Sequence, residues 1–301
     1  MSNSSQVSSL SEEIQSEERS FWGDARRQLL HDPLTLIALF VLLFLTLASF
    51  AGPPVVENIL NVDVEDASVR DRYLPPSQEH ILGTDHLGRD QLIRLLYGGR
   101  VSLMVAYAAS ILSMTIGLVV GIIAGYSGGI VDDAIMWFIS TLTSIPALFL
   151  LLIATSIFSP SATILVFVLG LLGWLEMARL IRGQVLMLKG QEFVLAAQAL
   201  GSSPIHIMMA HILPNVISIA LISVTINAGS VILAESSLSF LGLGVQAPTP
   251  TWGNMLSDSR SYFARGLHLV IFPGTLITVT VLCFFLVGDG LRDALDPRSR
   301  K

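Results

Sequence analysis

Cysteine and charge are both scarce in this sequence, and each shortage excludes a class of protein. Cys283 is the only cysteine and stands within an apolar run, so no intrachain disulfide is possible and no redox pair is indicated. Charged residues make up 13% of the 301 residues, whereas soluble domains carry roughly 25%. The net charge of −6 and the lack of a basic cluster argue against a protein that binds nucleic acid.

Two motifs are also missing. No G-x-x-x-x-G-K-[ST] string occurs, so the chain is not expected to hold ATP in the usual phosphate-binding loop. Residues 1–32 are rich in serine and glutamate and contain no apolar run at the start, which argues against a cleavable signal peptide. We expect residues 1–20 to be disordered, because they cannot bury enough apolar surface to fold.

Apolar residues, by contrast, make up 52% of the chain and gather in long runs. Each run is close to the ~20 residues that a helix needs to cross a ~30 Å hydrocarbon core. The sequence therefore predicts an all-α polytopic membrane protein with six transmembrane helices. Pro146 lies inside the third run and predicts a kink there. The six runs are residues 34–50, 101–126, 134–158, 162–180, 216–233 and 267–287.

Six spans place both ends of the chain on one side of the membrane. That side carries ten lysine and arginine residues and the other side carries seven. Because basic residues favour the cytoplasmic side, both termini are expected in the cytoplasm. The predicted regions are a cytoplasmic tail at 1–32, a first transmembrane helix at 33–52, an extracytoplasmic segment with an interfacial helix at 53–100, a core of five helices at 101–288 and a cytoplasmic tail at 289–301.

Residues 190–215 form a polar insert between two apolar runs, and the same orientation places them in the cytoplasm. Gly201 stands where a first short helix would end, and Ser203-Pro204 has the pattern of a second helix start. We expect two short helices that meet at Gly201, an arrangement that an ordinary helical hairpin would also show. The apolar stripe of the first helix is predicted to contain Phe193, Ala196, Ala197 and Leu200.

This insert resembles the EAA loop with which inner-membrane permease subunits of bacterial ABC importers dock on their ATPases. The residues that match the family spacing are Ala196, Ala197, Gly201, Leu213 and Pro214. The chain departs from the pattern at Leu195, where the family usually has glutamate, and at His211, where the wider family has isoleucine. Glu192 is the candidate for the missing acid.

Four further strings resemble the peptide and nickel branch of that family, and the likeness extends over roughly the last two thirds of the chain. The resemblance implies a type I ABC importer transmembrane domain that makes half of a translocation path and is not itself an enzyme. It also implies a second homologous permease subunit, two ATP-binding subunits that hold the ATP, and an extracytoplasmic substrate-binding protein. The implied substrate is a dipeptide or oligopeptide, with nickel or glutathione as the alternative. The strings are residues 83–90, 144–148, 238–255 and 288–298.

Polar residues inside the predicted spans are the candidates for the substrate path, because such groups usually face the bundle interior. Asn227 in the fifth run and Glu235 near its outer end are predicted to line the path, although helix–helix hydrogen bonding explains Asn227 equally well. Glu176 and Arg179 end the fourth run, where we expect them to pair as anchors at the cytoplasmic interface.

The outer segment contains Asp85, Arg89 and Asp90, which are expected to form local ion pairs before an interfacial amphipathic helix. His80 and His86 flank this string, but their spacing matches no familiar metal site. The apolar positions of the expected interfacial helix are Leu92, Leu95, Leu96 and Tyr97.

Two other functions stay open. Residues 125–129 fit the serine motifs G-x-S-x-G and G-x-S-G, but Ser127 follows a membrane helix and no histidine lies deep in a predicted span, so a glycine turn is favoured. A secondary transporter or channel would work without an ATPase, and would be expected to carry internal repeats or an acid deep in a span. Neither feature is evident.

Overall fold

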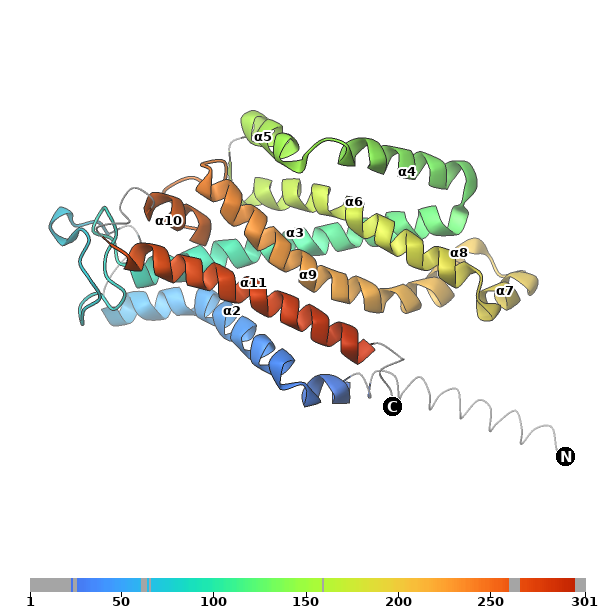
Figure 1. Cartoon of the computed structure of the whole chain (residues 1–301), viewed down its shortest axis with the longest axis horizontal. Coiled ribbons are helices and arrows are strands. Elements are labelled where there is room, and N and C mark those ends of the chain that lie inside the picture. The colour runs from blue at the N-terminus through green and yellow to red at the C-terminus, as the bar shows by residue number, and fades with distance from the viewer. Residues whose placement is uncertain are drawn as a thin grey trace.

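The computed structural model describes residues 23, 26–60, 64, 66–158, 160–259 and 266–295. Over these residues the fold is helical and contains no strand (Figure 1). Two short elements are not α-helical, namely the 3₁₀ helix η1 at Val69–Asp71 and the π-helix η2 at Ile207–Ile212. The α-helices are α2 (Pro33–Leu60), α3 (Gln91–Ser127), α4 (Gly129–Thr143), α5 (Ala147–Ile157), α6 (Ala162–Lys189), α7 (Glu192–Ala199), α8 (Pro204–His206), α9 (Leu213–Phe240), α10 (Trp252–Ser259) and α11 (His268–Leu295).

Five helices of the described chain are long and apolar enough to cross a membrane, and the pair α4 and α5 makes a sixth span if it is counted as one. The predicted all-α membrane fold is therefore confirmed. The kink expected at Pro146 is a complete break, because α4 ends at Thr143, α5 begins at Ala147, and the two helices are bent by 80°. Proline has no N–H to donate and keeps the residue before it out of the helical region, which accounts for the break.

Two predicted boundaries are wrong. The first helix does not stop at residue 52 but continues through Pro53 and Pro54 to Leu60. Residues 91–100 do not form a separate interfacial helix, because they are the first turns of α3. Ile93 and Leu95 are buried in the protein core rather than exposed to a lipid surface, and a buried helix face has the same apolar spacing as an interfacial one.

The close contact between α3 and α6 depends on glycine. Gly117, Gly121 and Gly125 recur at every fourth residue of α3 and face α6. A Cβ atom at Gly121 would lie 2.7 Å from Cβ of Ile181, and one at Gly125 would lie 2.7 Å from Cβ of Val185. Small residues at this spacing let two membrane helices approach closely. The pair α3 and α6 thus forms a tightly packed part of the bundle.

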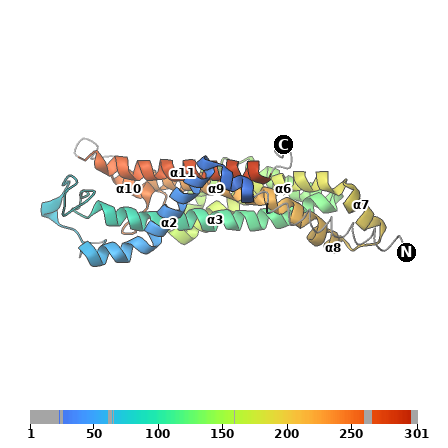
Figure 2. The same ribbon diagram turned by 90° about the horizontal axis from the view of Figure 1, so that it is seen from below.

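The two polar regions, the insert and the segment before α3, lie at opposite ends of the bundle. The helices α7 and α8 of the insert lie at one end, and the segment that leads into α3 lies at the other (Figures 1 and 2). The start of α2 and the end of α11 point toward the end that carries the insert (Figure 1). Six spans that place the insert and both termini on one side of the membrane require this arrangement.

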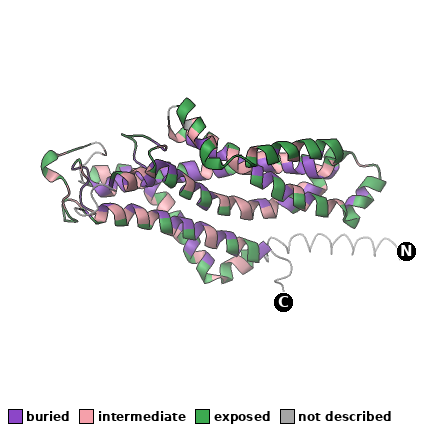
Figure 3. Cartoon of the chain, turned by 45° about the horizontal axis from the view of Figure 1, so that its top comes forward, coloured by how far each residue is buried: buried purple, intermediate pink, exposed green. Residues whose placement is uncertain are grey.

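Much of the apolar surface is on the outside of the bundle. Exposed residues follow α4 and the outer face of α5 (Figure 3). They include large side chains such as Trp137 and Phe149 on these two helices and Phe40 on α2. A soluble protein would not leave so many large apolar side chains uncovered, whereas a membrane protein presents them to lipid or to another subunit.

Candidate functional site

The first feature of the site is the corner at Gly201 in the insert. The N–H of Gly201 donates to the carbonyl of Gln198 at 3.0 Å, and the N–H of Ser202 donates to that of Ala197 at 3.1 Å. This pair of bonds is a Schellman motif, which requires a left-handed residue after the helix. Gly201 has φ of +79°, and no heavy atom lies within 4 Å of the place where its Cβ would be. Backbone conformation alone therefore requires glycine here.

The second helix of the insert starts as the sequence predicts. Ser203 is the N-cap, its hydroxyl accepts a hydrogen bond from the N–H of His206 at 3.3 Å, and Pro204 occupies the first turn. This helix runs without interruption through the π-helix η2 into α9. Pro214 has no backbone N–H to donate. The side-chain amide of Asn215 donates to the backbone carbonyl of His211 at 2.6 Å.

The insert packs on the bundle with a different face from the one predicted. Val194 and Ala197 of α7 are buried together with Ile207 and Ile212 of η2, and this cluster contacts Ile181 of α6. Of the predicted stripe, only Ala197 is buried. Phe193, Ala196 and Leu200 face outward, and Leu200 is 87% exposed. The exposed apolar side chains of the insert are Phe193, Leu195, Leu200, Ile205 and Met209.

The six residues predicted for docking divide into two groups. Ala197 is buried and Leu213 is half-buried, so both hold the insert on the bundle. Glu192 lies in the first turn of α7, where a carboxylate interacts favourably with the helix dipole. The outward-facing group is Glu192, Ala196, Gly201 and Pro214.

Two arginine contacts that join α6 to α4 were missed by sequence reasoning. Arg182 donates to both carboxylate oxygens of Asp132 on α4, at 2.5 and 2.6 Å. Arg179 does not pair with Glu176 as predicted, because its guanidinium donates to the hydroxyl of Thr143 on α4 at 2.7 Å. These partners are 36 to 50 residues apart in the chain, so no local pattern indicates them.

A second tie holds the end of α6 against the end of α3. The ammonium of Lys189 donates to the carbonyl of Tyr126 at 2.6 Å and lies 5.5 Å from the centre of its ring. The turn that follows contains Gly128 and Gly129, both with positive φ. Ser127 therefore ends a helix beside a glycine turn, as predicted, and no strand precedes it.

The second feature of the site is a pocket of about 330 Å³ between α6 and α9. Asn227 lines this pocket, and its buried Oδ1 atom accepts no hydrogen bond from the described residues. The position of Asn227 in the pocket lining is compatible with its predicted place on the substrate path, which stays a prediction. The lining residues are Gly173, Glu176, Met177, Leu180, Ser223, Ile226, Asn227 and Ser230.

Glu235 does not line this pocket, and its place on the substrate path stays a prediction. Its side chain is fully buried where α3 and α9 pack together. The hydroxyls of Ser102 and Ser239 donate to its two carboxylate oxygens at 3.1 and 2.7 Å. A buried carboxyl group loses its hydrogen bonds to water, and the two serine hydroxyls replace them. Glu235 therefore links α3 to α9 and does not line this pocket.

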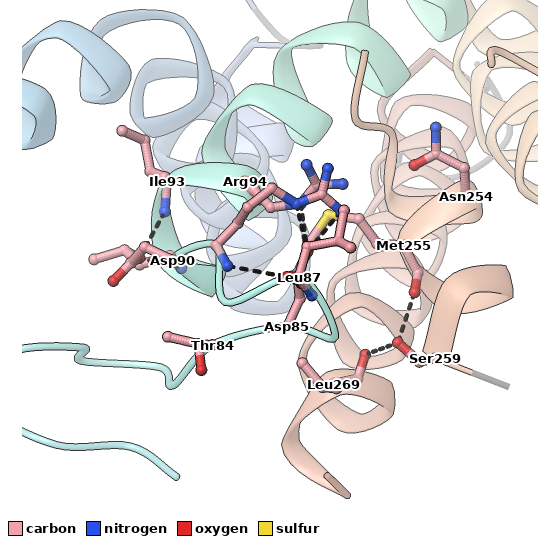
Figure 4. Close-up of polar contacts among 12 residues, drawn as sticks. Thr84, Asp85, Leu87, Asp90, Ile93, Arg94, Asn254, Met255, Ser259 and Leu269 are labelled. Atoms are coloured by element: carbon pink, nitrogen blue, oxygen red, sulfur yellow. Dashed lines mark hydrogen bonds and ion pairs between the residues drawn. The ribbon is translucent and has the colours of Figure 1, made fainter. Parts of the chain in front are cut away.

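At the opposite end, the segment before α3 contributes a cluster of charged groups (Figure 4). Asp85 and Arg89 form the expected ion pair at 2.7 Å, and Arg94 of α3 lies 3.5 Å from the same carboxylate. Asp90 instead caps α3 by accepting from the N–H of Leu92 at 2.8 Å, and it also contacts His80. Arg89 and Arg94 are almost completely buried.

Two carboxyl groups of this cluster have opposite pKa shifts. Burial alone would raise the pKa of Asp85, but the hydrogen bonds and charge of Arg89 and the charge of Arg94 outweigh it and hold the pKa below its usual value. Burial raises the pKa of Asp258, and the charges of His86 and the two arginines offset that effect only in part.

Comparison with known proteins assigns the chain to a family. The family model for the binding-protein-dependent transport system inner membrane component matches residues 117–301. The chain belongs to this family. The matched range contains the insert and the pocket, and a second model, for the N-terminal TM domain of oligopeptide transport permease C, matches residues 20–76 of the permease. The resemblance stated from the insert is therefore confirmed.

Full-length relatives support the same assignment. The permease is 39% identical to the oligopeptide transport system permease protein OppC of Escherichia coli strain K12, over 99% of this chain and 98% of the relative. It is 38% identical to OppC of Haemophilus influenzae, over 98% of this chain and 94% of the relative. The dipeptide transport system permease protein DppC of Bacillus subtilis is 38% identical over 94% of this chain and 87% of the relative.

Proposed function

We propose that this permease forms half of a membrane path for peptides and that separate ATP-binding subunits drive it through the insert. The near full-length similarity to permeases named for oligopeptides and dipeptides supports peptides as the substrate class, and it favours them over nickel. Glutathione, the remaining alternative, is itself a small peptide and is distinguished by the same transport assay.

Docking of the ATP-binding subunits is assigned to the outward face of the insert. Five large apolar side chains are exposed there, and a cluster of uncovered apolar residues at one end of a molecule marks an interaction site. The buried face of α7 and η2 fixes the insert on α6, so a force on its outer face is passed to the bundle. Since the chain has no phosphate-binding loop, ATP belongs to the partners.

The side of the molecule that faces the path is assigned from the pocket between α6 and α9. Its polar lining is unsuited to lipid, whereas the large apolar side chains of α2 suit contact with lipid. In this arrangement a second homologous permease closes the other half of the path. An extracytoplasmic binding protein delivers the substrate to the end opposite the insert, and both termini are cytoplasmic.

The test is uptake into vesicles that contain the complete complex. With ATP inside the vesicles and the binding protein outside, we expect uptake of a labelled tripeptide that stops when ATP is withheld. Nickel and glutathione are assayed in parallel on the same preparation. ATP-dependent uptake of either of these without uptake of any tested peptide would contradict the proposed substrate class.

A further inference from the structure

Glu176 lies nearer the middle of its helix than the sequence indicates, and its side chain is exposed. The helix α6 has 28 residues and continues to Lys189, so Glu176 is near its middle rather than near its end. Asn227 occupies a similar place near the middle of the 28-residue α9. The two residues line one pocket. The pocket is therefore far from both ends of the helices that form its walls.

Both residues offer hydrogen-bond acceptors that nothing in the described chain uses. Glu176 makes no hydrogen bond or ion pair with the described residues, since Arg179 turns to Thr143 instead. The Oδ1 atom of Asn227 is buried and equally unpartnered. Ser223 and Ser230 supply two hydroxyl groups to the same lining, although each of these donates its proton to a carbonyl of its own helix.

An unpaired carboxylate near the middle of a helix that spans the membrane requires a particular environment. Facing lipid it would cost several kcal/mol, so acidic residues in membrane helices face water-filled cavities or partners as a rule. The apolar part of the pocket lining is supplied by Met177, Leu180 and Ile226. A volume of about 330 Å³ is at the lower end of the range of roughly 300–1,000 Å³ for small-molecule sites.

We propose that this pocket binds the terminal ammonium group of a peptide in transit, with Glu176 and Asn227 Oδ1 as its acceptors. A primary ammonium has three donors and one positive charge, so it matches a carboxylate and an unused amide oxygen. Every peptide with a free amino end carries this group whatever its side chains, and a permease for varied peptides needs a contact of that kind. The inference rests on the proposed function, because it names the group recognised in the path.

A metal ion is the other cation that such a pocket could attract. In the part of the chain that the structure describes, no three histidine, cysteine or acidic side chains gather where they could hold a metal. Among the described residues, Glu176 is the only acidic group in the pocket lining. One carboxylate and one amide suit an ammonium better than a metal ion, which needs four or more ligands.

The test uses the assembled complex without binding protein and measures the labelling of a thiol in the pocket lining. Cys283 is replaced by alanine, and Ser230→Cys places a reporter thiol in the pocket lining. The thiol is labelled with methanethiosulfonate reagents that carry either a primary ammonium or a sulfonate. Glu176→Gln keeps the shape and removes the charge. Asp133→Asn, which removes an exposed carboxylate of α4 outside the pocket, is the matched control.

We expect Glu176→Gln to lower the ratio of ammonium to sulfonate labelling by about tenfold, and Asp133→Asn to leave it unchanged. In the complex that carries only Cys283→Ala and Ser230→Cys, the parent, trialanine should slow labelling of the reporter thiol, and N-acetyl-trialanine should not. Glu176→Gln should remove that difference. A melting temperature measured on each variant shows that the fold is kept.

Three results would overturn the inference. The first is a labelling ratio that does not change in Glu176→Gln, and the second is equal protection of the parent by both peptides. The third is a lack of protection by trialanine in a complex that transports peptides, which would place the pocket off the path. Failure of the proposed function is a separate result, because it would appear as absence of peptide uptake in the unmodified complex.

Discussion

Replacement of Gly201 by aspartate separates docking from folding. The residue has φ of +79°, and an L-residue with a side chain in this region costs about 1 kcal/mol. Space is not an obstacle, since no heavy atom lies within 4 Å of the added Cβ. The loss of stability should therefore be about 1 kcal/mol, which is small for a protein of this size. A loss of docking or coupling that exceeds what this loss of stability explains is expected to arise from a partner that contacts the corner.

Gly242 provides the matched control at the opposite end of the bundle. It also has φ of +79°, ends α9 with the same pair of backbone hydrogen bonds, and has open space around its Cβ position. Gly242→Asp should thus cost the same stability as Gly201→Asp. Only Gly201 lies in the insert, so only Gly201→Asp should weaken the contact with the ATP-binding subunits.

Three measurements test this pair of variants. Thermal unfolding gives the loss of stability, co-purification gives the amount of ATP-binding subunit that is retained, and ATP turnover in vesicles with substrate and binding protein gives the coupling. We expect similar unfolding temperatures, with retention and coupling lost in Gly201→Asp alone. Normal retention and coupling in Gly201→Asp would refute the assignment of the insert as the docking element. Equal losses in both variants would show that strain, and not contact, is responsible.

Three other predictions follow from the packing and the charges. Gly121→Ala places a Cβ 2.7 Å from α6 and should cost about 1–3 kcal/mol of stability by overpacking, whereas Gly183→Ala, with nothing within 4 Å, should cost none in the same unfolding assay. Asp85→Asn leaves two buried arginines without their shared carboxylate and should cost about 3 kcal/mol. Because the pKa of Asp85 is lowered by folding, this stability is present at neutral pH and is lost as the pH falls through the folded-state pKa, which unfolding curves at several pH values would show. A cysteine at Glu79 should react with an impermeant thiol reagent in intact cells and one at Ser202 only after permeabilisation, and the reverse pattern would overturn the proposed orientation.

Local features of the fold were predictable from the sequence, because each depends on neighbours in the chain. The corner at Gly201 needs only a glycine after one helix and Ser203-Pro204 before the next. The spans needed only long apolar runs. The break at Pro146 was located correctly and underestimated in size, because the sequence does not show whether neighbouring helices hold a proline-containing segment straight.

Features that depend on distant residues could not be predicted. The carboxylate of Asp132 accepts from Arg182 across 50 residues of sequence. Arg179 donates to Thr143 on the same helix as Asp132, which leaves Glu176 without its expected partner. Glu235 was assigned to the path because it is an acid in a span. The serines that satisfy it come from α3 and α9, and the position of α3 beside α9 is a property of the fold. The apolar spacing of α7 indicated one stripe that did not include Val194, and the packing against α6 buries Val194 instead of most of that stripe.

The insert and the pocket are connected because they share two helices. The first wall of the pocket is α6, which is joined to α7 by two residues, and the second wall is α9, which is continuous with η2. On its other side α6 is packed against the glycines of α3, where there is no space for it to move inward. We expect a displacement of the insert to change the position of α9 relative to α6, and with it the distance between Asn227 and Glu176. If the pocket binds a ligand that favours one spacing of these two helices, linkage predicts that the same ligand favours one position of the insert, and that occupancy of the pocket and affinity for the proposed ATP-binding subunits are coupled in both directions.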